Sequence, residues 1–329
     1  MAMSLLRTSR LARSAAPLLA TRAFSTSLAA QRDVKNITVF GAGLMGAGIA
    51  QVMAHKGGYN VTLADVSDKA LQTGSSIISK SLTRIFKKSM ADKSADEQAA
   101  AVKDIVGKIA FSKDAAQAVE KADLVVEAII ENVGIKQELF KFLDGKAPKE
   151  CIFATNTSSL SVTDVASTVS AERKKVFGGF HAFNPVPQMK LVEIVRTKET
   201  TPDAFDTLTG VAKQMGKVPV SCVDSPGFIV NRLLVPYMLE AIRMVERGEA
   251  SKEDVDTAMK LGAGYPMGPF ELSDLVGLDT LSHIAKGWRE TRTQTGEISA
   301  EAVKESALLE DLVKDGRTGK KSDKGGFYQ

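Results

Sequence analysis

The sequence is poor in the residues that build disulfide-rich, metal-binding or membrane-spanning proteins. Among 329 residues there are two cysteines and three histidines. Cys151 and Cys222 form no CxxC pair, which excludes a disulfide scaffold and gives no spacing typical of structural zinc, so we expect no metal. No apolar run reaches about 18 residues, and therefore we predict no membrane-spanning helix. The length suggests about two domains.

Acidic residues are absent from the first 32 residues, which hold five arginines and no lysine. An Arg-rich, Ser-rich and acid-poor stretch is typical of a mitochondrial transit peptide, whereas arginines interrupt the apolar core that a secretory signal needs. We therefore predict that residues 1–32 direct the protein to the mitochondrial matrix. Arg22 then stands at −3 of a processing site after Phe24. The alternative is a tail without function.

The formal net charge of +4 comes from this leader. Without residues 1–32 the basic residues fall from 43 to 38, against 39 acidic ones. A nearly neutral remainder has no excess positive charge with which to attract a polyanion. We therefore expect no nucleic-acid partner.

Short apolar runs alternate with helical patterns over the first two thirds of the chain. Residues 69–109 form a polar-amphipathic insertion that predicts two helices broken near 92–96. The alternation predicts an α/β, Rossmann-like doubly wound sheet with a helical insertion. The predicted strands are residues 36–40, 60–65, 124–128, 152–155, 176–183, 191–196 and 218–223.

The pattern changes after residues 224–227, Asp-Ser-Pro-Gly. From Phe228 onward the periodicity is helical, and we predict that Leu233 shares one buried face with the apolar residues after it. Residues 33–224 are therefore predicted as a dinucleotide-binding domain, and residues 225–329 as a smaller all-α domain. Since helical domains of this kind commonly pair between subunits, we expect a homodimer through it.

A Gly-x-Gly-x-x-Gly turn joins the first strand to a helix, as in dinucleotide-binding βαβ units. There Gly41 allows the tight turn, Gly43 lets the backbone approach a pyrophosphate, and Gly46 lets the helix pack closely on the strand. Asp65 ends the second strand, where a carboxylate accepts ribose hydroxyls and repels a 2′-phosphate, which favours NAD over NADP. The alternatives are FAD or a turn that binds nothing. The predicted cofactor residues of this turn are Gly41, Gly43, Leu44, Met45 and Gly46.

His181 is the histidine best placed for chemistry. It ends an apolar strand before Asn184-Pro185-Val186-Pro187, where the prolines stop the strand. His181 and Glu193 are equidistant from Pro187, so a fold-back there lets their side chains face each other. Glu193 lies in an otherwise apolar strand, where an unpaired charge is costly. Such a pair makes a base for hydride transfer to NAD; a structural His–Glu pair is the alternative.

Two further segments carry candidate groups. Ser158 follows the end of an apolar strand, where its hydroxyl either holds a substrate oxygen or caps the next helix. Asn231, one turn into the first helix of the second domain, is within reach of the same cleft. His55 is expected at a solvated helix end, and His283 as a packing or surface residue.

Together these motifs resemble the L-3-hydroxyacyl-CoA dehydrogenase family from about residue 34 to residue 328. Members of that family oxidise the 3-hydroxyl of an acyl-CoA to a ketone and pass a hydride to NAD, a step of mitochondrial fatty-acid β-oxidation. The segments that carry the resemblance are GAGLMGAGIA (41–50), DLVVEAIIEN (123–132), NTSSL (156–160), HAFNPVP (181–187), LVEI (191–194), SPGFIVNRLL (225–234) and GPFELSDLVGL (268–278).

The resemblance implies roles for residues of the site. His181 is implied as the general base and Glu193 as its orienting partner, while Ser158 and Asn231 would hydrogen-bond the reacting oxygen. Glu131 and Lys136 are implied to contact the nicotinamide half of NAD, and Asn184 is implied as a cofactor-binding residue that helps to shape the site.

The acyl-CoA substrate is implied to bind the helical insertion. There Ser81, Arg84 and Lys88 fall on one helical face, and the family points to Ser81 and Lys88 as CoA ligands; a solvated charged face is the alternative. Ala182 stands where relatives usually carry Phe or Met, which leaves the chain-length preference open. Two other functions stay open: a β-hydroxyacid dehydrogenase acting on free acids, which would use a catalytic lysine, and a catalytically silent structural relative.

Overall fold

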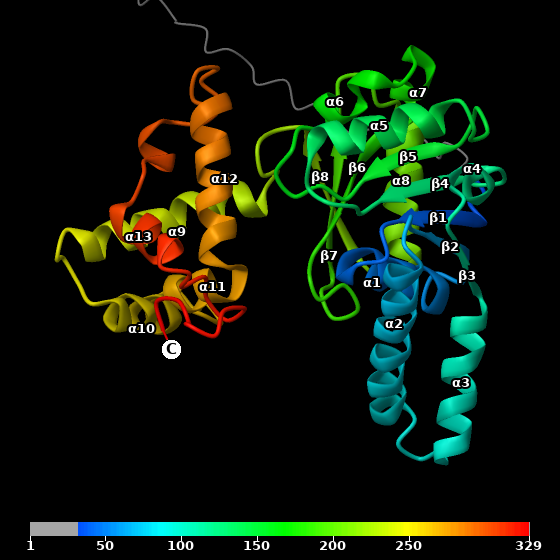
Figure 1. The fold of residues 1–329 in the computed structure, drawn as a ribbon, viewed down its shortest axis with the longest axis horizontal. Coiled ribbons are helices and arrows are strands. Elements are labelled where there is room, and N and C mark those ends of the chain that lie inside the picture. The colour runs from blue at the N-terminus through cyan, green and yellow to red at the C-terminus, as the bar shows by residue number, and fades with distance from the viewer. Residues whose placement is uncertain (1–31, 329) are drawn as a thin grey trace, which may run out of the picture. The chain divides into compact units, whose positions relative to one another are not determined.

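The computed structural model describes residues 32–328 (Figure 1). The predicted leader, residues 1–32, lies outside the described residues except for Arg32. Within the described range, no helix is both long enough and apolar enough to cross a membrane.

A sheet with the strand order β3-β2-β1-β4-β5-β6-β7-β8 is the centre of the first domain. Neighbouring strands pair in parallel except β6 and β7, which are antiparallel. The strands β1 to β6 therefore end at one edge, and the order reverses between β1 and β4, where doubly wound sheets bind ligands. The predicted fold class is confirmed. The strands are β1 (Asn36–Phe40), β2 (Asn60–Ala64), β3 (Ile109–Ser112), β4 (Leu124–Glu127), β5 (Ile152–Thr155), β6 (Phe177–Ala182), β7 (Leu191–Arg196) and β8 (Val218–Val223).

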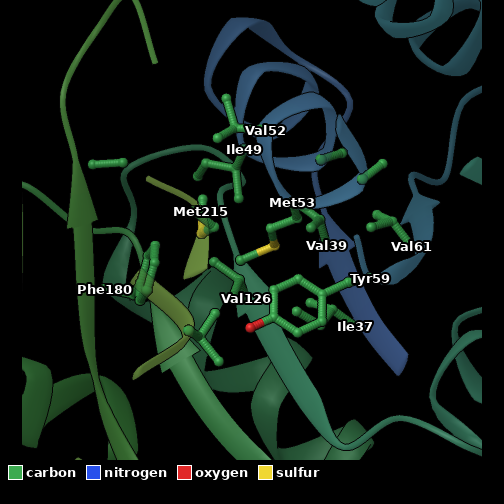
Figure 2. Close-up of a cluster of buried hydrophobic side chains, with 14 of the residues drawn as sticks. Ile37, Val39, Ile49, Val52, Met53, Tyr59, Val61, Val126, Phe180 and Met215 are labelled. Atoms are coloured by element: carbon green, nitrogen blue, oxygen red, sulfur yellow. The ribbon is translucent and has the colours of Figure 1, made fainter. Parts of the chain in front are cut away.

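Helices cover both faces of this sheet. One face packs against α1, α2 and α8 through an apolar core, part of which is drawn in Figure 2. The other packs against α5, where the rings of Phe140 and Phe177 meet edge to face at 4.7 Å. The helices of this domain are α1 (Leu44–His55), α2 (Asp68–Ser89), α3 (Ala95–Gly107), α4 (Ala115–Val119), α5 (Val133–Asp144), α6 (Val162–Val165), η1 (Ala166–Thr168), α7 (Ala171–Lys175) and α8 (Pro202–Gln214).

The helical insertion agrees with the prediction except at its end. The break is present, because α2 ends at Ser89 and α3 begins at Ala95 after a capping box formed by Ser94 and Glu97. The helical pattern assigned up to residue 109 is wrong there, since Ile109 begins the edge strand β3. Only Ile109 of its four residues is buried, so the strand has little apolar signal. His55 is also not simply solvated, because its ring packs against Phe86 at 5.2 Å.

The second domain contains helices and no strand in its described part, and it has its own apolar core. Leu233 corrects one prediction: it is 68% exposed. The buried stripe of α9 runs through Val235, Met238, Leu239 and Ile242, and at about 100° per residue Leu233 projects from the opposite side. The helices are α9 (Val230–Glu246), α10 (Lys252–Gly262), α11 (Pro269–Val276), α12 (Leu278–Thr291), η2 (Glu301–Val303) and α13 (Ala307–Lys314).

Candidate active site

The glycine turn after β1 leaves an open backbone at the N-terminus of α1. Gly41 has φ +97°, and a Cβ there would lie 2.5 Å from the carbonyl oxygen of Ala128. A Cβ on Gly46 would lie 1.8 Å from the carbonyl oxygen of Gly41, so this helix and strand approach as closely as glycine permits. Gly43, in contrast, is exposed and has nothing within 4 Å of a Cβ position. The space above Gly43 therefore fits a pyrophosphate held at the helix N-terminus.

A cavity of about 480 Å³ adjoins this turn and includes Asp65 in its wall. The carboxylate oxygens of Asp65 accept hydrogen bonds from the backbone N–H groups of Ala42 (2.9 Å) and Ser67 (3.0 Å). Val66 and Ile130, which also line the cavity, are 92% and 67% exposed. Apolar walls beside an anchored carboxylate fit the adenosine half of a dinucleotide.

His181 and Glu193 face each other across the β6–β7 hairpin. They are direct partners in the antiparallel register, and His181 Nδ1 lies 2.7 Å from Glu193 Oε2. Both side chains are buried. Because a carboxylate only accepts hydrogen bonds, Nδ1 is the donor, and in the neutral imidazole Nε2 then keeps its lone pair. An imidazole held in this tautomer is able to accept a proton at Nε2.

Glu193 also ties this pair to the second domain. Its other oxygen, Oε1, accepts hydrogen bonds from the backbone N–H groups of Ile229 (3.1 Å) and Val230 (2.9 Å) at the start of α9. The rings of Phe228 and Phe183 lie 5.5 and 4.4 Å from the imidazole of His181. Glu193 is therefore satisfied on both oxygens, and the imidazole has apolar neighbours.

A second cavity, of about 320 Å³, opens at His181. Asn231 Nδ2 donates to the carbonyl oxygen of Ser158 (3.2 Å), so α9 contacts the loop after β5. Asn156, which was not predicted as a site residue in its own right, accepts from the N–H of Ala182 at 2.9 Å and fixes the backbone next to His181. The predicted residues that line this cavity are Met45, Glu131, Ser158, His181, Asn184 and Asn231.

A buried charge cluster lies behind this cavity, and of its three members Glu131 and Lys136 were predicted as cofactor residues whereas Glu127 was not predicted. Lys136, only 1% exposed, donates to Glu127 Oε1 at 2.6 Å and lies 3.1 Å from Glu131 Oε2. Glu127 is fully buried and also accepts from Thr155 Oγ1 at 2.7 Å. Glu127 interrupts an apolar strand, as Glu193 does, so the same reasoning about unpaired charge would have found it. The cluster joins the ends of β4 and β5 to α5.

Glu131 connects this cluster to the loop that carries Ser158. Its Oε1 accepts from Thr157 Oγ1 (2.6 Å) and from the N–H of Ser158 (2.9 Å). Burial alone would raise the pKa of Glu131, but the positive charge of Lys136 and these donors hold that pKa below its usual range. Glu131 is therefore a carboxylate that fixes the loop and adds negative charge to the cavity wall.

Ser81 and Lys88 are not brought to His181. Both lie on α2, Ser81 half-buried and Lys88 exposed, and neither lines the two cavities described above. Within residues 32–328, no group of histidine, cysteine or acidic side chains is arranged to hold a metal ion.

A dinucleotide-binding turn at the switch point of a doubly wound sheet, beside a buried histidine–carboxylate pair, defines a nucleotide-dependent dehydrogenase. Comparison with protein families specifies it further. The family model "3-hydroxyacyl-CoA dehydrogenase, NAD binding domain" matches residues 36–225, and "3-hydroxyacyl-CoA dehydrogenase, C-terminal domain" matches residues 227–329. The chain belongs to the 3-hydroxyacyl-CoA dehydrogenase family. Its cofactor is NAD, and its activity is the NAD-dependent oxidation of a 3-hydroxyacyl-CoA.

Proteins of known name match this chain over nearly its whole length. The human "Hydroxyacyl-coenzyme A dehydrogenase, mitochondrial" is 51% identical over 298 residues, which are 90% of this chain and 91% of that protein. A "Probable 3-hydroxybutyryl-CoA dehydrogenase" of Bacillus subtilis is 39% identical over 90% of this chain and 97% of its own. The crystal structure of (S)-3-hydroxybutyryl-CoA dehydrogenase from Ralstonia eutropha, at 35% identity, has a TM-score of 0.79 and covers 90% of this chain and 98% of that one. The predicted family is confirmed.

Proposed function

We propose that His181 is the general base of the oxidation of an L-3-hydroxyacyl-CoA. The observation that carries the proposal is the buried His181–Glu193 pair, which leaves Nε2 free at a cavity shared with the cofactor turn. NAD, when bound, supplies the hydride acceptor. Nε2 takes the hydroxyl proton while the C3–H bonding pair leaves the substrate and the ketone forms. Glu193 stabilises the resulting imidazolium and fixes its orientation.

Ser158 and Asn231 hold the reacting oxygen in this proposal. The amide of Asn231 has two N–H groups, and one of them donates to the carbonyl oxygen of Ser158. The second N–H is then available to the substrate oxygen, whose charge grows in the reverse, ketone-reducing direction. The Ser158 hydroxyl, which donates to Glu131 Oε1 at 3.5 Å, would turn from that long bond to the substrate oxygen. Because Asn231 belongs to the second domain, catalysis would require contact between the domains.

The cofactor would be held along the switch point of the sheet. The turn with Leu44 and Met45 would take the pyrophosphate, and Asp65 the adenosine ribose. Glu131 and Asn184 would line the nicotinamide half. Since Lys136 is buried against Glu127, we infer that Lys136 acts on the nicotinamide mainly through Glu131.

Replacement of Asp65 by alanine should weaken NAD binding and relax the preference for NAD over NADP. The carboxylate that would bond the ribose and repel a 2′-phosphate is then lost, together with its bonds to Ala42 and Ser67. Titration of both cofactors, with Asp65→Asn as the variant that removes the charge alone, measures the change. An unaltered NAD/NADP ratio in both variants would make Asp65 a turn-fixing residue only.

Ser81 and Lys88 are proposed to hold the CoA moiety on α2. An exposed lysine suits CoA because CoA carries several phosphate charges, and the two side chains lie seven residues apart on one helix. In this proposal the affinity for the substrate depends partly on α2, which does not contact the reacting carbon.

One assay separates this function from its alternatives. NADH oxidation is measured with acetoacetyl-CoA and with free acetoacetate. We expect turnover of the CoA ester and little of the free acid. Preference for the free acid would indicate the related β-hydroxyacid dehydrogenase, and inactivity on both a catalytically silent relative.

We also propose that residues 1–32 are a transit peptide and that the enzyme works in the mitochondrial matrix, with its domains divided at 224/225. The arginine-rich, acid-free composition of the leader and the mitochondrial names of several relatives support this. Import of the full chain into isolated mitochondria, compared with a chain that begins at Asp33, tests it. Equal uptake of both would contradict the proposal.

A homodimer through the helical domain is proposed from its exposed apolar side chains. Leu233, Leu261 and Leu275 are 68%, 83% and 52% exposed, and a partner subunit that covered them would remove this apolar surface from water. Sedimentation of the mature chain at micromolar concentration should give a dimer, and Leu261→Asp should weaken it by placing charge in the interface. A clean monomer in the unaltered protein would overturn this proposal.

A further inference from the structure

Lys217 is a buried lysine outside the groups discussed so far. It lies between α8 and β8, is 9% exposed, and donates from Nζ to the carbonyl oxygens of Val186 (2.6 Å) and Met189 (2.8 Å). It makes no ion pair in the described part of the chain. Burial lowers the pKa of its ammonium group. Burying an ammonium group costs free energy, and here only two carbonyl groups offset that cost. The two hydrogen bonds in turn restrain the loop that carries these carbonyl groups.

That loop, residues 183–190, joins β6 to β7 and forms part of the wall of the His181 cavity. At its start the ring of Phe183 packs on the imidazole of His181 at 4.4 Å, and Asn184 lines the same cavity. The carbonyl groups that bind Lys217 belong to Val186 and Met189, which follow Phe183 and Asn184 in the loop. The ammonium thus holds the middle and the later part of the loop, at Val186 and Met189, while its first two residues shape the reaction site.

The loop also rests on the cofactor-binding helix α1. Val186 is buried, and a Cβ on Gly48 of α1 would lie 2.9 Å from Val186 Cβ, so no larger residue fits between loop and helix. A displaced Val186 would have to move against α1 or away from it. The loop therefore connects the helix that follows the cofactor turn with the wall around His181.

We propose that Lys217 is a positioning residue for hydride transfer. By holding the carbonyl groups of Val186 and Met189, it fixes the loop against α1 and so sets the distance between the cofactor side of the cavity and the substrate held at His181. The inference rests on the proposed function of this cavity. Lys217 itself touches neither substrate nor cofactor; it acts through the loop.

Lys217→Met tests the proposal because it keeps most of the side-chain volume and removes both donors. We expect kcat to fall by roughly tenfold to a hundredfold, since a displacement of about 1 Å can have such an effect. The Kd of NAD should stay within about a factor of two, because the cavity at Asp65 is untouched. With NADH deuterated at the transferred position, the isotope effect on acetoacetyl-CoA reduction should rise as hydride transfer becomes slower.

Two further variants provide the controls. Lys217→Arg keeps the charge and the donors and should restore much of kcat, whereas Lys213→Met changes an exposed lysine at the end of α8 and should have no effect. If Lys217→Met does not fold, Lys217→Gln replaces it; this neutral side chain is too short to reach both carbonyls, and the same rise is expected. An isotope effect and a kcat like those of the unaltered enzyme, in a folded but less stable variant, would overturn the proposal. Failure of the proposed function is detected separately, because a His181 variant with unaltered kcat would show that His181 is not the base. Failure of the Lys217 proposal alone would leave the effect of the His181 variant in place.

Discussion

His181→Gln should lower kcat by roughly 10²–10⁴-fold in a protein that still folds, which is the usual contribution of a general base. Glutamine has no group that accepts a proton near neutral pH, but its amide can still donate to Glu193 and so satisfy the buried carboxylate. The loss should therefore appear in turnover rather than in folding. Reduction of acetoacetyl-CoA at saturating NADH measures it.

The matched control for this variant is His283→Gln. His283 is an exposed histidine on α12, and the same substitution there should leave kcat unchanged. NAD affinity, measured on both variants, verifies that the cofactor turn is intact. A His181→Gln enzyme within a factor of two of the unaltered one would show that His181 is not the base and that the pair with Glu193 is structural.

Much of the sheet was predictable because its strands are buried on both faces. Strands such as β1 and β5 are nearly continuous apolar runs, and a glycine turn with the right neighbours joins β1 to α1. β3 is different, since an edge strand of four residues with a single buried side chain has no such run. The side of α9 that holds Leu233 was also mispredicted, because an apolar residue on an exposed face is indistinguishable in sequence from one on the buried face.

The reactive pair was predictable for a local reason. Glu193 interrupts an apolar strand, and Pro187 lies midway between it and His181, so the hairpin register follows from the spacing. Glu127 carries the same signal and was overlooked because its partner, Lys136, lies on an amphipathic helix where lysines are normally solvated. The spacing of Glu127 and Lys136 in the sequence could not indicate that pairing, because it forms only once the end of β4 packs against α5.

The second set of partners of Glu193 was not predictable at all. The N–H groups of Ile229 and Val230 reach it only because α9 begins beside β7, which depends on how the two domains meet. Such contacts are set by tertiary packing, whereas hairpin registers are set within one segment. They nevertheless determine what a substitution at Glu193 would do.

Glu193→Gln should reduce kcat by about 10²–10⁴-fold through a change of tautomer at His181, by analogy with other histidine–carboxylate pairs. Glutamine offers one acceptor oxygen in place of two. If that oxygen keeps the N–H groups of Ile229 and Val230, the amide N–H₂ faces Nδ1 of His181. Nδ1 must then accept, the proton moves to Nε2, and the imidazole is no longer able to take a proton from the substrate.

The opposite orientation of the glutamine is less favourable. Its oxygen would then accept from His181 Nδ1, but its N–H₂ would oppose the backbone N–H groups of Ile229 and Val230, and each unsatisfied buried donor costs about 1–3 kcal/mol. We therefore expect a large loss of turnover with a modest loss of stability, as measured by kcat and by the free energy of unfolding in urea. A variant that is strongly destabilised but turns over normally would contradict the tautomer argument. It would indicate that Glu193 serves to join the second domain to the sheet rather than to orient the base.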